Sequence, residues 1–289
     1  MTPTILTIGN FDGVHLGHRQ LISSTIALAR SWCGHAIAIT FSPHPRQFFS
    51  PSDHFFLYPQ KIKEKMLNSL GLDEVIYLPF KEIYRLTPEQ FFDTILLPLE
   101  PAAIVLGNNF TFGANKSGDL NLLRKFCASH DIALHSLTMM TYGGQPVSSS
   151  RIRTAIQNGN IQEANDMLGA PYTLYGEVIR GAGRGHLIGV PTANIHPVDQ
   201  VMPKCGAYVT QVRIESGNEL YPAMTAVTQT PTFDHVETRL ETPIPNFSQD
   251  LYGKQISVAF CRFLREEMVF ESTEDLVDQL RRDCLEIGR

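Results

Sequence analysis

The stretch Gly-Asn-Phe-Asp-Gly-Val-His-Leu-Gly-His at residues 9–18 decides the fold of the first half of the chain. It follows the apolar run 4–8 and precedes a pattern with helical spacing, which predicts a turn from a buried strand into a helix. At such a turn the free backbone N–H groups and the helix dipole favour an anion, and glycines let the backbone approach it closely. We therefore expect a phosphate group to bind against Gly9, Gly13 and Gly17.

Short apolar runs alternate with helical patterns up to about residue 170, which is typical of a parallel sheet covered by helices. Further buried strands are expected at 36–41, 74–78 and 103–106. A helix over 60–70 is expected to bury the stripe Ile62, Met66 and Leu70 and to end at Gly71.

After Pro171 the sequence changes to strands without helices between them, which predicts a small antiparallel barrel. These strands are expected at 173–179, 208–214, 220–225 and 255–260. A capping box at 272–275 begins a last helix, and two short helices link the halves. We thus expect an α/β domain over residues 1–165 and a barrel domain over 170–289.

Composition sets limits on the function. The chain has 289 residues, 43% of them apolar and 18% charged, as in ordinary globular proteins. A net charge of −5 offers no attraction for nucleic acid. The five scattered cysteines fit neither a disulfide framework nor a zinc site, so we expect reduced core thiols. The start of the chain has no leader pattern and no apolar run reaches ~20 residues, which predicts a cytoplasmic protein.

His15 and His18 stand in the predicted phosphate turn. Two imidazoles there can donate hydrogen bonds to the charge that develops on a phosphorus centre during displacement. Two other interpretations stay open for these residues alone. They can be a pair of surface histidines, or half of a metal site for which His44 is the nearest further ligand.

A second candidate phosphate site lies at residues 147–153, Val-Ser-Ser-Ser-Arg-Ile-Arg, where a helix begins. Its hydroxyls, its free amides and Arg151 suit the outer phosphates of a nucleotide. In isolation these serines can also be read as the cap of a linker helix. Two phosphate sites at the two ends of one α/β domain favour a nucleotide.

These motifs resemble the prokaryotic bifunctional riboflavin kinase/FMN adenylyltransferase family, also called FAD synthetase. The matching segments, in family order, are 7–18, Phe-Ser-Pro-His-Pro-Arg at 41–46, Gly-Asn-Asn-Phe-Thr-Phe-Gly at 107–113, and 147–153. The resemblance implies a Rossmann-like nucleotidyltransferase domain in which His15 and His18 act at the α-phosphate of ATP. The nucleotide-binding residues that it implies here are Gly9, Asn10, Phe11, Gly17, Asn109, Ser149, Ser150 and Arg151.

Other enzyme classes share part of this pattern. His-x-Gly-His also occurs in other adenylyl- and cytidylyltransferases and in class I aminoacyl-tRNA synthetases. The acidic charge balance and the absence of a Lys-Met-Ser-Lys-Ser loop disfavour a synthetase. A P-loop kinase is also disfavoured, because no glycine precedes Lys116 as that motif requires.

A glycine-rich segment at 175–194 begins the second half. Gly183 and Gly185 can wrap phosphates with backbone amides, and Thr192 and Asn194 offer the oxygen ligands that Mg²⁺ accepts. A dinucleotide-binding fingerprint does not fit, because no helical pattern follows the glycines. A plain β-turn loop stays open as the alternative.

The resemblance extends over this half as a riboflavin kinase-like antiparallel barrel with a C-terminal helix. It implies that Glu241 is the catalytic carboxylate, which takes the proton of the ribityl hydroxyl as that oxygen attacks the γ-phosphorus. The sequence departs from the family pattern at His186, Val190, 228–230 and Pro243. Two of these changes replace arginine, which removes a fixed charged fork and puts substrate affinity in doubt.

The resemblance therefore implies an enzyme of FAD biosynthesis. It phosphorylates riboflavin to FMN and adenylylates FMN to FAD, with ATP as co-substrate and Mg²⁺ as cofactor in both reactions. The expected partners are small molecules, without nucleic acid or membrane, and the oligomeric state stays open. Two alternatives remain: a monofunctional FMN adenylyltransferase whose barrel only binds flavin, and a nucleotidyltransferase for another phosphorylated acceptor.

Overall fold

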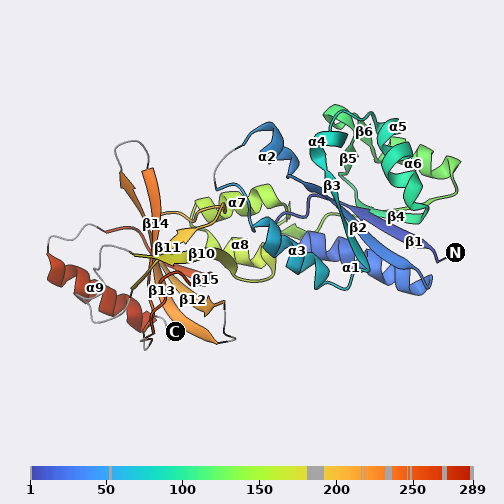
Figure 1. Cartoon of the computed structure of the whole chain (residues 1–289). Helices are drawn as coiled ribbons and strands as arrows, with labels where there is room; N and C mark the ends of the chain where they lie inside the picture. Colours follow the sequence, from blue (N-terminus) through green and yellow to red (C-terminus); the bar gives the residue numbers. More distant parts are fainter. Residues whose placement is uncertain are drawn as a thin grey trace. The chain divides into compact units, whose positions relative to one another are not determined.

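The computed structural model describes residues 2–51, 54–180, 192–215, 217, 219–231, 236–245, 247, 249–268 and 272–286. Contacts between Cα atoms group the chain into two units (Figure 1). The first unit consists of Met1–Asp53 and Gln60–Ser149, and the second consists of His54–Pro59 and Ser150–Arg289. The short segment 54–59 therefore belongs with the second half of the sequence.

A parallel five-stranded sheet in the order β3-β2-β1-β4-β7 forms the centre of the first unit. Its strands are β1 (Thr4–Ile8), β2 (His35–Ser42), β3 (Glu74–Pro79), β4 (Pro101–Gly107) and β7 (Ala133–Leu137). Its helices are α1 (Leu16–Ser31), α2 (Pro45–Phe49), α3 (Gln60–Asn68), α4 (Phe80–Ile83), α5 (Pro88–Phe91) and α6 (Leu120–Ser129). The parallel α/β fold predicted from the sequence is confirmed.

Short elements fill the connections of this unit. A π-helical turn η1 (Phe92–Leu96) and a 3₁₀ turn η2 (Leu97–Leu99) continue α5, and a second 3₁₀ turn η3 (Ala114–Lys116) precedes α6. Two small hairpins are β5 (Thr111–Phe112) with β6 (Gly118–Asp119), and β8 (Thr141–Tyr142) with β9 (Gln145–Pro146). These elements carry part of one helical layer and the loops after β4 and β7.

Alternation along the buried strands divides the core between the two faces of the sheet. On one face Ile5, Ala38 and Val105 pack in clusters with the apolar residues of α1 and α3. On the other face Leu6 and Ile104 pack with side chains from α5, η1 and α6. Helices therefore cover both faces of the sheet. The loops that follow the carboxyl ends of the strands are left as the place where a ligand can bind.

The second unit contains a closed antiparallel barrel in the order β10-β11-β14-β13-β12-β15. Its strands are β10 (Tyr172–Ile179), β11 (Thr192–Pro197), β12 (Gly206–Ile214), β13 (Leu220–Pro231), β14 (Val236–Pro243) and β15 (Gln255–Arg265). Its helices are α7 (Ser149–Gln157), α8 (Ile161–Leu168) and α9 (Thr273–Leu285). The barrel and the last helix are confirmed, with Ser272 Oγ accepting from the Asp275 amide at 3.1 Å as the capping box predicts.

Buried threonines cross the inside of the barrel. The hydroxyl of Thr225 lies 2.9 Å from those of both Thr210 and Thr242, so three strands share one chain of hydroxyl contacts. These polar groups are satisfied inside an otherwise apolar core. The residues that flank Thr242 in the sequence therefore face the outside of the barrel wall.

Segment 54–59 and helix α8 pack on the barrel strands within the second unit. The buried side-chain amide of Gln200 donates to the carbonyls of Leu57 and Thr173, both at 3.0 Å. Asn165 of α8 donates to the Phe260 carbonyl at 2.9 Å and accepts from the Tyr172 amide at 2.7 Å. The contacts therefore group 54–59 and 150–168 with the barrel, whereas the sequence assigned both segments to, or next to, the first half.

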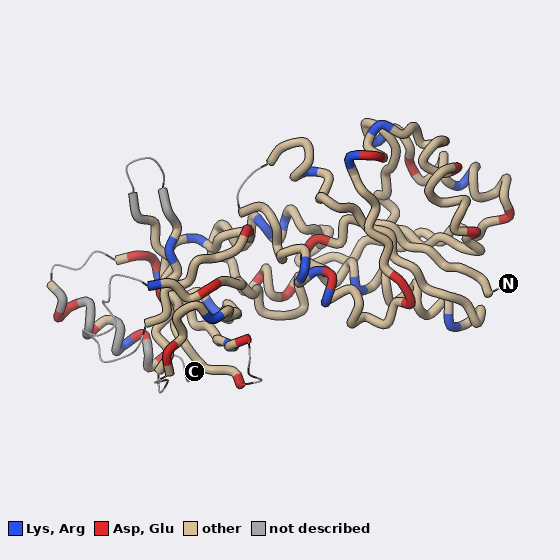
Figure 2. Tube along the Cα trace, in the orientation of Figure 1, with Lys and Arg blue, Asp and Glu red and all other residues tan. Residues whose placement is uncertain are grey.

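Charges and thiols complete the description. Acidic and basic residues are interspersed along the described trace (Figure 2). The four cysteines whose side chains the structure describes carry free thiols, and Cys127 is buried, but Cys33 is exposed, so the expectation of core thiols is wrong for Cys33. No helix among the described residues is long and apolar enough to cross a membrane.

Candidate active site

The loop after β1 is tightly wound. Phe11, Gly13 and Val14 have φ angles of 50°, 83° and 40°, in the left-handed region that β-branched residues rarely adopt. The side chains of Phe11 and Val14 are fully buried in the cluster beneath α1 and α3. Packing of these two side chains therefore stabilises a strained backbone, as is common where a loop must hold a ligand.

His15 caps α1 and contacts His18. Its Nδ1 accepts a hydrogen bond from the His18 amide at 3.3 Å, and the two rings stack with centroids 3.5 Å apart. His15 is only 4% exposed. Because Nδ1 is the acceptor, the proton of the neutral imidazole lies on Nε2, which makes Nε2 a hydrogen-bond donor.

Burial keeps both histidines neutral. Desolvation lowers the pKa of His15 to about 4. Desolvation is also the largest cause that lowers the pKa of His18, followed by the nearby His15 and Lys63. His18 Nδ1 is buried and has no hydrogen-bond partner among the described residues. Two neutral donors near a helix N-terminus suit the charge of a phosphate.

Two glycines make this packing possible. A Cβ at Gly9 would lie 3.0 Å from the Phe11 ring, and a Cβ at Gly17 would lie 3.3 Å from the His15 ring. A larger residue at either position would therefore push against an aromatic ring and require that ring to shift.

Three of the expected binding residues lie at one edge of the sheet. The strand order reverses between β1 and β4, and ligands of open α/β sheets bind at the carboxyl ends of the strands at this point. Asn10 follows β1 and Asn109 follows β4. Ser149 Oγ donates to the Asp12 carbonyl at 2.8 Å, which joins the end of the first unit to the histidine loop.

Ser150 and Arg151 fall in the second unit. Arg151 donates to Oε1 of Glu163 from Nη2 at 2.5 Å and from Nε at 3.1 Å, across the turn between α7 and α8. The sequence did not identify Glu163 as a partner of Arg151. This ion pair holds the guanidinium at the start of α7, next to the serines of the same segment.

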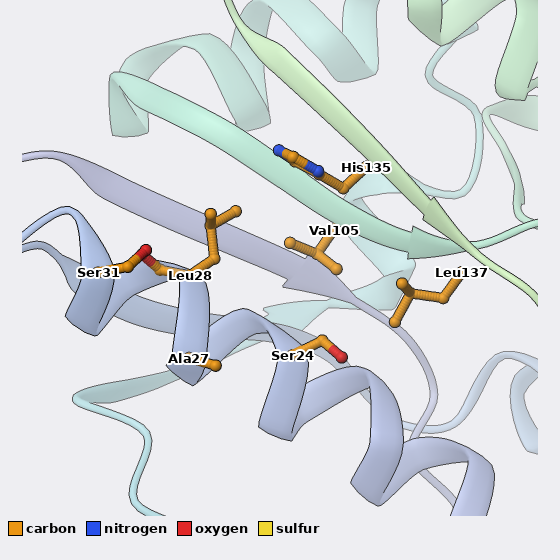
Figure 3. A pocket seen from close by; sticks show the side chains of 7 residues that line it. All are labelled: Ser24, Ala27, Leu28, Ser31, Val105, His135 and Leu137. Carbon is orange, nitrogen blue, oxygen red and sulfur yellow. The ribbon is translucent and has the colours of Figure 1, made fainter.

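A shallow depression of about 360 Å³ lies elsewhere in the first unit (Figure 3). Its lining comes from α1, β4 and β7, with Ser24, Val105, His135 and Leu137 around it. None of the expected site residues lines it. The residues expected to bind the nucleotide therefore lie away from this depression.

The register of the barrel brings two expected kinase residues together. Asn194 on β11 lies directly opposite Glu241 on β14, and Thr192 lies opposite Pro243. Side chains opposite each other on neighbouring strands have Cβ atoms about 5 Å apart. Thr192, Asn194 and Glu241 therefore share the outer face of the wall. Gly183 and Gly185, together with His186 and Val190, lie outside the described residues.

Comparison with known proteins covers both units. A family model described as FAD synthetase matches residues 1–151, and one described as riboflavin kinase matches residues 168–289. A bifunctional riboflavin kinase/FMN adenylyltransferase of Listeria monocytogenes is 32% identical over 96% of this chain and 90% of its own length. The Escherichia coli protein of the same name is 32% identical over 97% and 90%. This chain belongs to the bifunctional riboflavin kinase/FMN adenylyltransferase family.

A solved structure supports the fold along the full length. A crystal structure described as a macrolide-efflux protein from Streptococcus pneumoniae has a TM-score of 0.91 and 32% identity, and covers 100% of this chain and 94% of that one. The fold of this riboflavin kinase/FMN adenylyltransferase family member is thus shared by a related chain. The description as a macrolide-efflux protein belongs to that chain.

Two features of the adenylyltransferase half were missed from the sequence. Lys63 on α3 is buried next to the loop, although lysine normally signals a solvated helix face. Four aromatic rings, Phe48, Phe49, Phe80 and Tyr84, contact one another after the carboxyl ends of β2 and β3. The clustering of phenylalanine in 41–49 was the available signal for this surface.

Proposed function

We propose that this chain performs both reactions of its family, phosphorylating riboflavin to FMN and adenylylating FMN to FAD. The observation that carries the proposal is the match of a FAD synthetase model to the parallel α/β unit and of a riboflavin kinase model to the barrel. Incubation with riboflavin, ATP and Mg²⁺, followed by chromatography, tests it. The expected products are FMN and then FAD. If neither product forms, the proposal is wrong.

In adenylyl transfer a phosphate oxygen of FMN attacks the α-phosphorus of ATP, and pyrophosphate leaves. We assign His15 and His18 as donors to the charge that develops on the α-phosphate oxygens. Their neutral state and the N-terminus of α1 support this role. The binding residues of this proposal are Gly9, Asn10, Phe11, Gly17 and Asn109, with Ser149, Ser150 and Arg151 for the outer phosphates.

In the kinase reaction Glu241 takes the proton of the ribityl hydroxyl as its oxygen attacks the γ-phosphorus. The residues on the same wall fit a divalent cation, because Thr192 and Asn194 supply oxygen donors beside a carboxylate. We propose that Thr192 and Asn194 hold Mg²⁺, with Gly183 and Gly185 on the phosphates. When bound, Mg²⁺ neutralises charge on the transferring phosphate oxygens.

The aromatic surface supports a flavin as the acceptor of the adenylyl group. Phe49 is 65% exposed although its ring contacts Phe80 and Tyr84. An exposed aromatic ring at the same edge of the sheet as the proposed phosphate site suits a flat heterocycle. A panel of FMN, phosphopantetheine and a sugar phosphate separates the candidates. We expect adenylylation of FMN alone, and transfer to either other acceptor favours the alternative reading.

The remaining assignments are also proposals. We expect the protein to act in the cytoplasm on small molecules, without nucleic acid or membrane as partner. The functional domains are taken as 1–165 and 170–289, a division that concerns activity and differs from the grouping of contacts. The alternative is that the barrel only binds flavin, and an assay of riboflavin phosphorylation by the wild type tests it. If the wild type forms no FMN above background, this alternative is favoured.

A further inference from the structure

Lys63 is a buried lysine that the mechanism above does not use. It lies in the middle of α3 and is only 5% exposed. Lysine is almost never buried unless its charge is paired, because removal of the ammonium from water is costly. A lysine at this position therefore needs a compensating role.

The ammonium of Lys63 contacts the phosphate-binding loop. Its Nζ lies 3.4 Å from the Asn10 carbonyl and 3.5 Å from the Thr40 hydroxyl on β2. The Thr40 hydroxyl itself donates to the Asn10 carbonyl at 3.2 Å. The Asn10 carbonyl thus accepts from a donor on α3 and from a donor on β2 at the same time.

The charges around this ammonium come from several elements. Asp12 of the loop and Glu64 of α3 partly offset the cost of burial, and the Tyr77 ring on β3 lies 5.9 Å from Nζ. Burial raises the pKa of Tyr77 to about 12, so this phenol is neutral. His18 lies close enough for the positive charge of Lys63 to disfavour a proton on its imidazole.

We propose that Lys63 is a positioning residue for adenylyl transfer, whose buried ammonium fixes the Asn10 carbonyl against β2 and keeps a positive charge beneath the histidine pair. This inference rests on the proposed function of the first unit. The loop carries Asn10, His15 and His18, so a shift of its backbone moves every donor aimed at the phosphate. A displacement of about 1 Å in such a site costs on the order of 10²-fold in rate.

The test replaces Lys63 with methionine, which keeps length and apolar volume but removes the charge and the donors. Lys61→Met and Lys65→Met are matched controls, because both side chains are exposed on the same helix. FAD formation from supplied FMN is measured for kcat and for the KM of ATP. FMN formation by the barrel of the same sample reports whether the chain is folded.

We expect Lys63→Met to lower kcat for FAD formation by about 10- to 100-fold, with a smaller change in KM and normal FMN formation. Both control variants should match the wild type. If wild type forms FAD and Lys63→Met forms it equally fast, the role of Lys63 is wrong while the proposed function stands. If wild type forms no FAD from FMN, the proposed function itself fails.

The pH profile separates positioning from a purely structural role. Removing the positive charge raises the pKa of His18, so the acid limb of FAD formation should move to higher pH in Lys63→Met and not in Lys65→Met. Thr40→Val is the second variant, in case Lys63→Met does not fold. This variant removes one hydrogen-bond acceptor of the Lys63 ammonium but keeps the positive charge of Lys63. We therefore expect kcat to fall while the acid limb of the pH profile stays at the wild-type pH. An unchanged kcat in Thr40→Val would contradict the proposal.

Discussion

At the scale of single residues, the unusual choice is a histidine at a helix N-cap. Serine, threonine, aspartate or asparagine normally fills this position, because a short side chain can accept from the first free amides. His15 accepts from the His18 amide through Nδ1, and this bond leaves the Nε2 proton as a donor. One side chain thus satisfies a free amide at the start of α1 and offers a neutral donor to the proposed phosphate site.

His18→Ala should abolish most FAD formation and leave FMN formation unchanged. Loss of one donor aimed at developing charge typically costs about 10²–10³ in rate. The comparison is FAD formation from supplied FMN against FMN formation from riboflavin. His135→Ala, an exposed histidine beside the shallow depression, is the control and should behave as wild type. Equal losses of both activities would rule out separate sites.

The lowered pKa of His15 predicts acid sensitivity of the first unit. The folded-state pKa of about 4 lies below the unfolded value of 6.5, so folding favours the neutral ring. Its contribution is complete above pH 6.5 and is lost as pH falls toward 4, a change of roughly 3 kcal/mol. Urea unfolding at several pH values measures the slope of the free energy of unfolding against pH. His15→Asn keeps a cap acceptor without a titrating ring and should show a smaller slope; an identical slope contradicts the assignment.

Arg151→Lys should raise the KM of ATP in FAD formation several-fold, because a point charge replaces a guanidinium fork. FMN formation should stay at the wild-type rate. Glu163→Gln is the informative control, since it removes the ion pair with Arg151 but keeps the guanidinium. If both variants lose only thermal stability and keep the same KM, Arg151 serves the α7–α8 turn and not ATP.

At the scale of elements, the barrel wall shows how strand register brings together residues that are remote in sequence. Asn194 and Glu241 are far apart in sequence, and neither carries a local signal that distinguishes it from a solvent-facing polar residue. Antiparallel pairing of β11 with β14 sets them opposite each other on the outer face. A shift of one residue in this register would bury Glu241 and expose Thr242.

Glu241→Gln should lower FMN formation by roughly 10²–10⁴, because the amide keeps the shape of the side chain but cannot accept the proton. FAD formation from supplied FMN should persist. Glu177→Gln on β10 is a matched control, since Glu177 is exposed on the same barrel and outside the proposed site. Full activity of Glu241→Gln would mean that another group accepts the proton.

The helices show which parts of the structure were within reach of the sequence. The turn at 9–18 and the last helix were predicted because a local signal marks each. In α3 the buried side chains are Lys63 and Leu67, whereas the predicted stripe 62, 66 and 70 is only partly buried. Apolar periodicity cannot identify a lysine whose burial depends on Asn10 and Thr40, which are remote in sequence. The pairing of Arg151 with Glu163 and of Asn194 with Glu241 could not be predicted either, because the partners are likewise remote in sequence.

At the scale of the whole molecule, the boundary of the second unit does not follow the order of the chain. Phe55 donates its amide to Asp199 at 3.0 Å, and its carbonyl accepts from Arg153 Nε at 2.9 Å. The guanidinium of Arg153 also lies 4.1 Å from the centre of the Phe55 ring. The buried segment 54–59 is thus part of the folded unit that contains the barrel.

Phe55→Ala should destabilise the second unit by about 3–5 kcal/mol, because it removes a buried ring and the stacking partner of Arg153. Phe49→Ala is the same substitution a few residues earlier, at a ring that is 65% exposed against 5% for Phe55. Thermal inactivation of FMN formation is the measurement. We expect a clear fall in the midpoint for Phe55→Ala and little change for Phe49→Ala; the reverse order would contradict the grouping.

The path of segment 54–59 has a consequence for how the two activities are inherited. A fission of the gene after residue 149 would give a barrel polypeptide without Phe55, Leu57 and Tyr58, all of which are buried in the intact unit. That polypeptide would expose the apolar surface that these residues now cover. The side chains of Gln200 and Arg153 would also lose the carbonyl groups of this segment as hydrogen-bond acceptors. Two separate genes would therefore have to encode this hexapeptide twice, once to join β2 to α3 and once to complete the barrel.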